Sequence, residues 1–105
     1  MKVNKELLKG SLEILILSVV KDSPRYGYDI VRQIKARSQD VFSLGEGTLY
    51  PLLHKLENAG WLASYWQEIE GRRRKYYTIT SQGKKFLAAK SVEWKTFSQA
   101  INQLL

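Results

Sequence analysis

The sequence predicts a mainly α protein of the α+β class, a winged helix-turn-helix followed by one long C-terminal helix. Three observations predict this fold: the order of the expected elements, a run of arginines between two expected strands, and a basic composition. The chain has 105 residues, of which 17 are Lys or Arg and 10 are Asp or Glu, for a net charge of +7. Because 44% of the residues are hydrophobic, we expect a packed core rather than a disordered basic tail. A folded basic domain favours a polyanionic partner, with nucleic acid first and an anionic membrane surface second.

The first two expected helices carry apolar residues at helical spacing. The first covers residues 6–20, is apolar on nearly all sides in its C-terminal half, and ends before Pro24. The second covers residues 26–37, with Ile30, Val31 and Ile34 facing inward. A turn over residues 43–47, which contains two glycines, separates it from the next helix.

The third expected helix covers residues 48–59, with Thr48 as its N-cap and Gly60 as its C-terminal cap. Pro51 lies in the first turn, where its missing N–H costs little. One face is a stripe of leucines that predicts burial in the core. The outward residues available to a partner are Thr48, Tyr50, His54 and Lys55.

Two strands and a last helix complete the predicted fold. The strands cover residues 62–69 and 75–79, and residues 70–74 between them form the predicted hairpin tip. Thr80 is the expected N-cap of a helix over residues 81–103. We therefore divide the chain into a winged helix-turn-helix domain, residues 1–80, and a C-terminal dimerisation helix packed on it, residues 81–105.

The arrangement of the third helix and the hairpin predicts DNA binding. A helix fits the major groove, and its outward side chains reach base edges, so Thr48, Tyr50, His54 and Lys55 are the candidate recognition residues. A basic hairpin beside that helix reaches flanking phosphates; its candidate residues are Arg72, Arg73, Arg74 and Lys75. The alternatives are a hairpin whose charges are only solvated and a Tyr50 that serves only in packing.

The last helix predicts a homodimer. Six positions are spaced 3, 4, 3, 4 and 3 apart, as in a heptad seam interrupted only by Lys90. A helix of this length spans roughly 35 Å, more than the core of so small a domain covers, and monomers rarely expose such an apolar stripe. The alternative is a stripe that folds back on its own domain. The predicted interface residues are Leu87, Trp94, Phe97, Ile101 and Leu104.

The same seam is a candidate ligand site, formed by Lys90, Trp94 and Phe97. Two tryptophans facing each other across a two-fold axis could hold a planar aromatic molecule between them, since offset ring stacking stabilises such contacts. The alternative is that Trp94 only fills the dimer core.

The residue inventory argues against catalysis, cofactors and metal binding. The chain has no cysteine and one histidine, His54, so neither a nucleophilic site nor a zinc site is expected. No apolar run approaches the length of a transmembrane helix, so we expect no membrane partner. The absence of cysteine fits a cytoplasmic location.

Six blocks of the sequence form an ordered set of motifs: LLKGSLEILIL (7–17), YGYDI (26–30), GTLYPLLHKLE (47–57), GWL (60–62), RKYYTIT (74–80) and Gly83. Together they resemble the PadR family of bacterial transcriptional regulators, in particular its small members with a single C-terminal helix. The resemblance covers nearly the whole chain, with Ser81-Gln82 as a departure where the family often has Pro-Glu. It implies a dimeric DNA-binding regulator, usually a repressor and sometimes relieved by an aromatic or drug-like compound.

The predicted function is therefore a sequence-specific DNA-binding regulator, a homodimeric repressor of a palindromic operator. The alternative is a winged-helix module that recognises protein and binds DNA only nonspecifically. The arginine run at residues 72–74 favours DNA, because a protein-binding module has little need of it.

Overall fold

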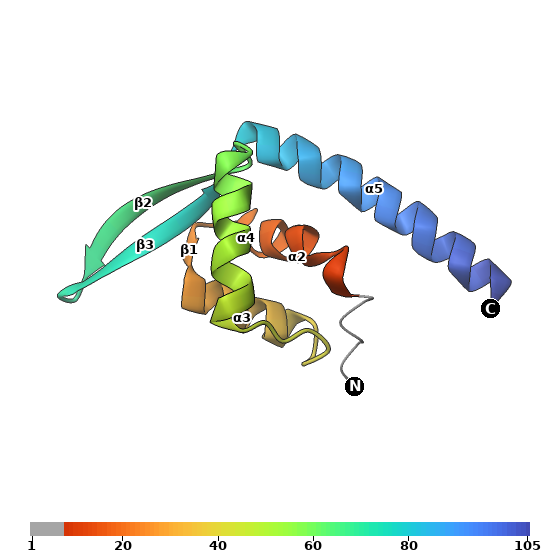
Figure 1. Cartoon of the computed structure of the whole chain (residues 1–105), viewed down its shortest axis with the longest axis horizontal. Helices are drawn as coiled ribbons and strands as arrows, with labels where there is room; N and C mark the ends of the chain where they lie inside the picture. Colours follow the sequence, from red (N-terminus) through yellow and green to blue (C-terminus); the bar gives the residue numbers. More distant parts are fainter. Residues whose placement is uncertain (1–7) are drawn as a thin grey trace.

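The computed structural model describes residues 8–105 and confirms the predicted fold class. Three helices pack together at the centre, a two-stranded wing projects on one side, and a long helix extends on the other (Figure 1). The principal extents are 53 × 30 × 21 Å. The elements are α2 (Leu12–Val20), β1 (Arg25–Tyr26), α3 (Gly27–Arg37), α4 (Glu46–Asn58), β2 (Leu62–Ile69), β3 (Arg72–Ile79) and α5 (Ser81–Leu104).

The core lies where α2, α3 and α4 meet the base of the sheet. The leucine stripe predicted on the third helix is buried there, with Leu49, Leu53 and Leu56 fully covered and Leu52 partly covered. Removing the apolar surface of these side chains from water stabilises the folded state by about 25 cal/mol per Å² buried. The other fully buried side chains are Ile16, Leu17, Val20 and Ile30.

The sheet is antiparallel with the strand order β1-β3-β2. The strand β1 was not predicted, because two residues are too short to show an alternating pattern. Its Tyr26 lies opposite Tyr76 of β3, which lies opposite Tyr65 of β2. The three tyrosines therefore share one face of the sheet.

The wing differs from the prediction at its tip. Glu70 and Gly71 have φ values of 53° and 76°, so they form a two-residue hairpin turn. The strand β3 begins directly after them at Arg72, and Arg72 lies opposite Ile69. The prediction that all five residues 70–74 form the tip was wrong, because a turn with two positive φ values needs only two residues.

Two other predicted helix boundaries were wrong. The helix α4 begins at Glu46 with Gly45 as its N-cap, and the N–H groups of Thr48 and Leu49 both donate to the Gly45 carbonyl. Thr48 is therefore already inside the first turn and is not the cap. The predicted first helix is interrupted at Gly10 and Ser11, and α2 begins at Leu12. The predicted start of that helix at residue 6 lies outside the described residues.

Thr80 is the N-cap of α5, as predicted, and it also connects the start of this helix to the rest of the domain. The Thr80 hydroxyl accepts a hydrogen bond from the Gly83 N–H at 3.0 Å and donates one to the Gly60 carbonyl at 2.6 Å. Phe86 stacks on Trp61 with ring centroids 3.6 Å apart. These contacts hold the first turns of α5 against the wing base.

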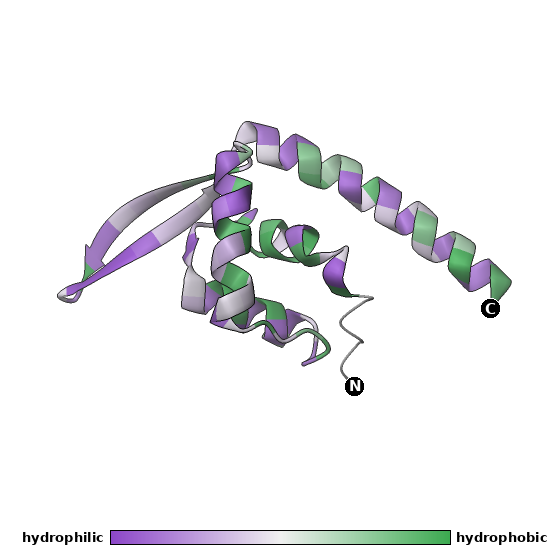
Figure 2. Cartoon of the chain, viewed as in Figure 1, coloured by the Kyte–Doolittle hydropathy of each residue, from purple (hydrophilic) through white to green (hydrophobic). Residues whose placement is uncertain are grey.

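The rest of α5 leaves the domain. Leu87 is only 7% exposed and belongs to the domain core, so its assignment to the dimer seam was wrong; the first turns of α5 still pack on their own subunit. Beyond them, hydrophobic and hydrophilic segments alternate to the C-terminus (Figure 2). The exposed apolar positions include Trp94, Phe97, Ile101 and Leu104. Within residues 8–105, no helix has both the length and the hydrophobicity needed to cross a bilayer.

Candidate nucleic-acid interface

The four outward residues predicted on the third helix are all exposed on α4: Thr48, Tyr50, His54 and Lys55. Tyr50 also packs, because a Cβ on Gly27 would lie 2.8 Å from its hydroxyl oxygen. Gly27 therefore makes room for the Tyr50 ring at the start of α3. Tyr50 keeps 41% of its surface exposed, so packing fixes the ring while leaving one side accessible.

Lys55 has a partner that sequence reasoning missed. Its Nζ lies 2.8 Å from Glu13 Oε1 on α2, although the two residues are 42 positions apart. Two-thirds of the Lys55 side chain stays exposed, so the pair is screened by water and adds little stability. It nevertheless places a carboxylate against a lysine of the candidate recognition surface.

The wing arginines lie along β3 and alternate between the two faces of the hairpin. Arg73 covers the Trp66 ring at 4.5 Å, and Arg74 covers the Tyr26 ring on the other face at 4.3 Å. A guanidinium over an aromatic face is held by cation–π attraction and keeps its N–H donors at the edge. These arginines are therefore partly oriented before any partner binds. Neither Trp66 nor Tyr26 was among the functional residues predicted from the sequence.

Two hollows that share Tyr26 and Arg74 lie along the wing, and the second of them reaches α4. One of about 600 Å³ is lined by Tyr26, Tyr28 and the three arginines of residues 72–74. The other, of about 380 Å³, includes side chains from both elements. Among its lining residues are Tyr50, His54, Trp66, Arg74 and Lys75. Of the predicted recognition residues, Tyr50 and His54 therefore border the same basic and aromatic surface as the wing residues, whereas Thr48 and Lys55 line neither hollow.

Lys75 differs from the three arginines. Its Nζ lies 3.8 Å from Glu57 Oε1 near the end of α4, and the Ser64 hydroxyl donates to Glu57 Oε2 at 2.5 Å. Burial raises the pKa of Tyr77 above 10.0, and the negative charge of Glu57 raises it further. Lys75 therefore lies midway along β3 and has a carboxylate of the same chain as its ion-pair partner.

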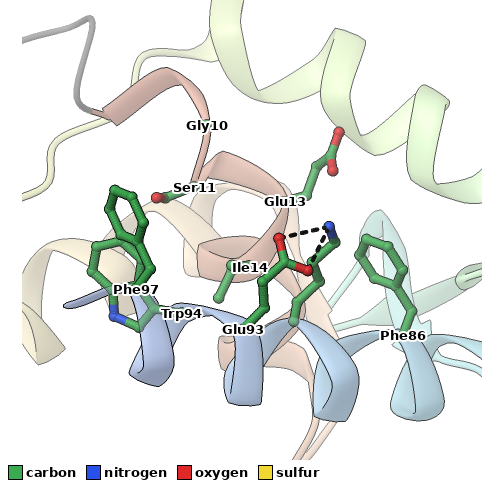
Figure 3. Close-up of a pocket in the computed structure, with 9 residues that line it drawn as sticks. Gly10, Ser11, Glu13, Ile14, Phe86, Glu93, Trp94 and Phe97 are labelled. Carbon is green, nitrogen blue, oxygen red and sulfur yellow. Dashed lines mark hydrogen bonds and ion pairs between the residues drawn. The ribbon is translucent and has the colours of Figure 1, made fainter. Parts of the chain in front are cut away.

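The predicted ligand residues Lys90, Trp94 and Phe97 line a third hollow of about 370 Å³. It lies between α5 and the N-terminal part of α2, and Figure 3 shows Trp94 and Phe97 at one end and Phe86 at the other. The Trp94 and Phe97 rings are 5.9 Å apart, and Lys90 Nζ lies 3.4 Å from the Glu93 carboxylate. Glu13, the partner of Lys55, also lines this hollow.

The sequence of this chain matches a known family over the elements just described. Residues 16–89 match the transcriptional regulator PadR-like family, from α2 through the wing to the first turns of α5. The chain belongs to the PadR-like family. The resemblance noted in the sequence is thereby confirmed.

Solved structures of PadR-like and other regulators are similar over nearly the full chain. A transcriptional regulator from Clostridium thermocellum is 33% identical with a TM-score of 0.87, covering 94% of this chain and 97% of its own. A PadR family transcription regulator from Clostridium difficile is 38% identical with a TM-score of 0.81, covering 90% and 98%. The transcriptional regulator Rv3488 of Mycobacterium tuberculosis is 30% identical over 80 residues, or 76% of this chain and 72% of its own.

PadR-like membership establishes the general role of the winged helix. The chain is a transcriptional regulator, which implies DNA binding, and it is not an enzyme. The surface shared by α4 and the wing is the basic, aromatic surface that such binding requires.

Proposed function

We propose that this PadR-like protein is a repressor that binds a palindromic operator as a homodimer in the cytoplasm. One observation carries the proposal: three arginines on a projecting hairpin, two of them already stacked on aromatic rings beside α4. Guanidinium groups neutralise phosphates and release counterions, which supplies affinity for DNA of any sequence. A protein-binding winged helix would have little need of this cluster.

Base recognition is assigned to α4. When α4 lies in the major groove, its exposed side chains reach base edges. Among them, His54 and Lys55 can donate hydrogen bonds to guanine. Thr48 and Tyr50 lie nearer the N-terminus of the helix, the end that enters the groove most deeply in many helix-turn-helix proteins. Arg72, Arg73 and Arg74 then contact the phosphates beside the site. Lys75, predicted as a fourth phosphate contact, differs from these arginines because its Nζ lies 3.8 Å from Glu57 Oε1.

The dimer is assigned to α5. Trp94, Phe97, Ile101 and Leu104 are spaced 3, 4 and 3 apart on the part of α5 that follows the buried Leu87, and all four are exposed in the single chain. A second copy that covers this stripe gives an isologous interface and two recognition helices related by a two-fold axis. Such a dimer reads two half-sites about one DNA turn apart, ~34 Å. In this proposal residues 1–80 bind DNA and residues 81–105 dimerise.

An effector is the second part of the proposal. The hollow beside Trp94 and Phe97 has aromatic walls and the Lys90 ammonium at its edge, which suits a planar aromatic molecule. Because α5 also carries the proposed dimer seam, a molecule bound there could favour one arrangement of the two subunits over another. Quenching of tryptophan fluorescence by planar dyes, lost in Trp94→Ala, would support this part; quenching unchanged in the variant would exclude it.

The function is tested by selecting bound duplexes from a random DNA pool with the full chain. We expect one enriched palindrome, and repression of a reporter that carries it.

Replacing Arg72, Arg73 and Arg74 by Ala should weaken binding to that operator and to random DNA about equally. With six charges lost per dimer, the slope of log K against log salt should flatten by up to about 5.

The matched comparison is His54→Ala. If His54 reads a base, the variant should lose about 1–3 kcal/mol on the operator and little on random DNA. Selection that enriches no sequence, together with a wing variant that binds DNA as tightly as the natural chain, would favour the alternative of a protein-recognition module.

A further inference from the structure

One carboxylate joins the candidate recognition helix to both strands of the wing. Glu57 lies on the last turn of α4, and each of its oxygens has a different partner. Its Oε2 accepts from the Ser64 hydroxyl on β2 at 2.5 Å, and its Oε1 lies 3.8 Å from Lys75 Nζ on β3. About a third of the Glu57 and Lys75 side chains is exposed, so the group is partly shielded from water.

The negative charge of this carboxylate opposes the binding of a polyanion at the neighbouring surface. Lys75 lines the same hollow as His54 and Arg74, so phosphates seated there would be repelled by Glu57 and would compete with it for Lys75. The charge of Glu57 already acts on its surroundings, because it helps raise the pKa of the buried Tyr77.

The arginines farther along the wing are treated differently. Within residues 8–105, Arg72, Arg73 and Arg74 form no ion pair, so their charge is available to a partner. Lys75, in the middle of β3, is the one cation of residues 72–75 that has an ion-pair partner. The wing therefore carries three arginines that are available to DNA and one lysine, Lys75, that is held by Glu57.

We propose that Glu57 is a positioning residue that sets DNA specificity, by fixing the wing relative to α4 and by keeping Lys75 off the phosphates. The proposal rests on the proposed DNA-binding function and adds a residue that is not itself a DNA contact. A wing held at one angle engages DNA only when α4 is also seated in its groove. A lysine that is already paired adds less to sequence-independent attraction, which is the main term in nonspecific binding.

The Glu57→Gln variant isolates the charge, because the Gln amide oxygen can still accept from Ser64. Binding is measured by fluorescence anisotropy on the selected operator and on a random duplex over a series of salt concentrations. We expect tighter binding to random DNA, with a salt slope steeper by up to about 2 for the two lysines released per dimer. The ratio of operator to random affinity should fall by about tenfold, comparable to one mismatched base pair.

Two further variants separate the two roles. Glu57→Gln combined with Lys75→Gln should return the salt slope to that of the natural chain, since no lysine is left to release. Ser64→Ala breaks the contact with β2 and leaves the charge in place, so it should lower operator affinity without changing the slope. A residue with a merely structural role would weaken binding to both DNAs and leave the slope unchanged.

The inference is overturned if Glu57→Gln leaves both slope and affinity ratio unchanged, or if the double variant keeps a steeper slope. If Glu57→Gln does not fold, Lys75→Gln alone decides: a slope equal to that of the natural chain supports the withheld lysine, and a flatter slope refutes it. Natural protein that binds no DNA would instead refute the proposed function itself, so the two failures are distinguishable.

Discussion

Gly83 shows how a single residue can reverse a general propensity. It is buried in the first turn of α5, where a Cβ would overlap the backbone oxygen of Trp61 and lie 2.8 Å from the Ile79 side chain. In an open helix, Gly→Ala stabilises by up to about 1 kcal/mol. Here the obstacle is backbone, so we expect Gly83→Ala to destabilise the fold by about 1–3 kcal/mol, as overpacking does.

Urea denaturation followed by circular dichroism measures this difference, and Gly47→Ala is the matched control. Gly47 also lies in the first turn of a helix, but a Cβ there meets nothing within 4 Å. That variant should be as stable as the natural chain or slightly more stable. Equal stability of the two variants would contradict the packing argument.

Side-chain directions on α4 could be predicted from the sequence, but the internal partners of those side chains could not. The 3.6-residue period separates the buried Leu53 and Leu56 from the exposed His54 and Lys55. The partner of Lys55 is Glu13, which a periodicity within one helix cannot reveal because it lies 42 residues away. Glu57 was missed in the same way, since its partners lie on two strands whose register depends on the hairpin turn.

At the scale of the element, Arg25 and Asp29 fasten the start of α3. Arg25 donates to the Val19 carbonyl at 2.6 Å and to Asp29 Oδ2 at 2.9 Å. Burial alone would raise the pKa of Asp29, but the hydrogen bond and the charge of Arg25 outweigh it and hold that pKa below 3.8. The carboxylate form is therefore favoured by folding.

A lowered folded-state pKa predicts a loss of stability in acid. The Asp29 contribution is complete above its unfolded pKa near 3.8 and is lost as the pH falls through the lower folded-state value. We expect Asp29→Asn to be less stable at pH 7 by about 1.5–3 kcal/mol, the usual range for a hydrogen bond to a charged group. Urea unfolding between pH 2 and 7 should show a flatter acid limb for the variant; parallel curves would contradict the assignment.

The order of the helices and of the two wing strands could be predicted from the sequence, but β1 and the extent of the wing could not. Long periodic segments such as α3 and α5 give strong patterns, and the cap at Thr80 has a side-chain signature. The arginine run is predicted as part of the hairpin tip, residues 70–74. The arginines form a strand because Glu70 and Gly71 alone complete the turn and the pairing of β2 with β3 continues to Arg72.

At the scale of the whole molecule, basic and apolar surfaces lie on different extensions. The wing carries the arginines to one side, and α5 carries an apolar stripe to the other (Figures 1 and 2). The stripe could be predicted from heptad spacing, except at Leu87, where the sequence does not show how far the domain core reaches along α5. A monomer that exposes this stripe would leave a contiguous apolar patch in water, which a second copy can cover.

The seam predicts that a charge at Phe97 prevents dimer formation. Phe97 is 53% exposed in the single chain, so Phe97→Glu does not disturb the core and the variant should fold. Burying an unpaired carboxylate in an apolar interface costs several kcal/mol, enough to shift a dimer to monomers at micromolar concentration.

Val92 provides the matched control, because it is 66% exposed and lies outside the heptad positions. The Val92→Glu variant should therefore stay dimeric. Analytical ultracentrifugation checks both, and the monomeric variant should also lose operator affinity because its two half-sites are no longer bound together. Sedimentation of Phe97→Glu as a dimer would show that the subunits meet through another surface.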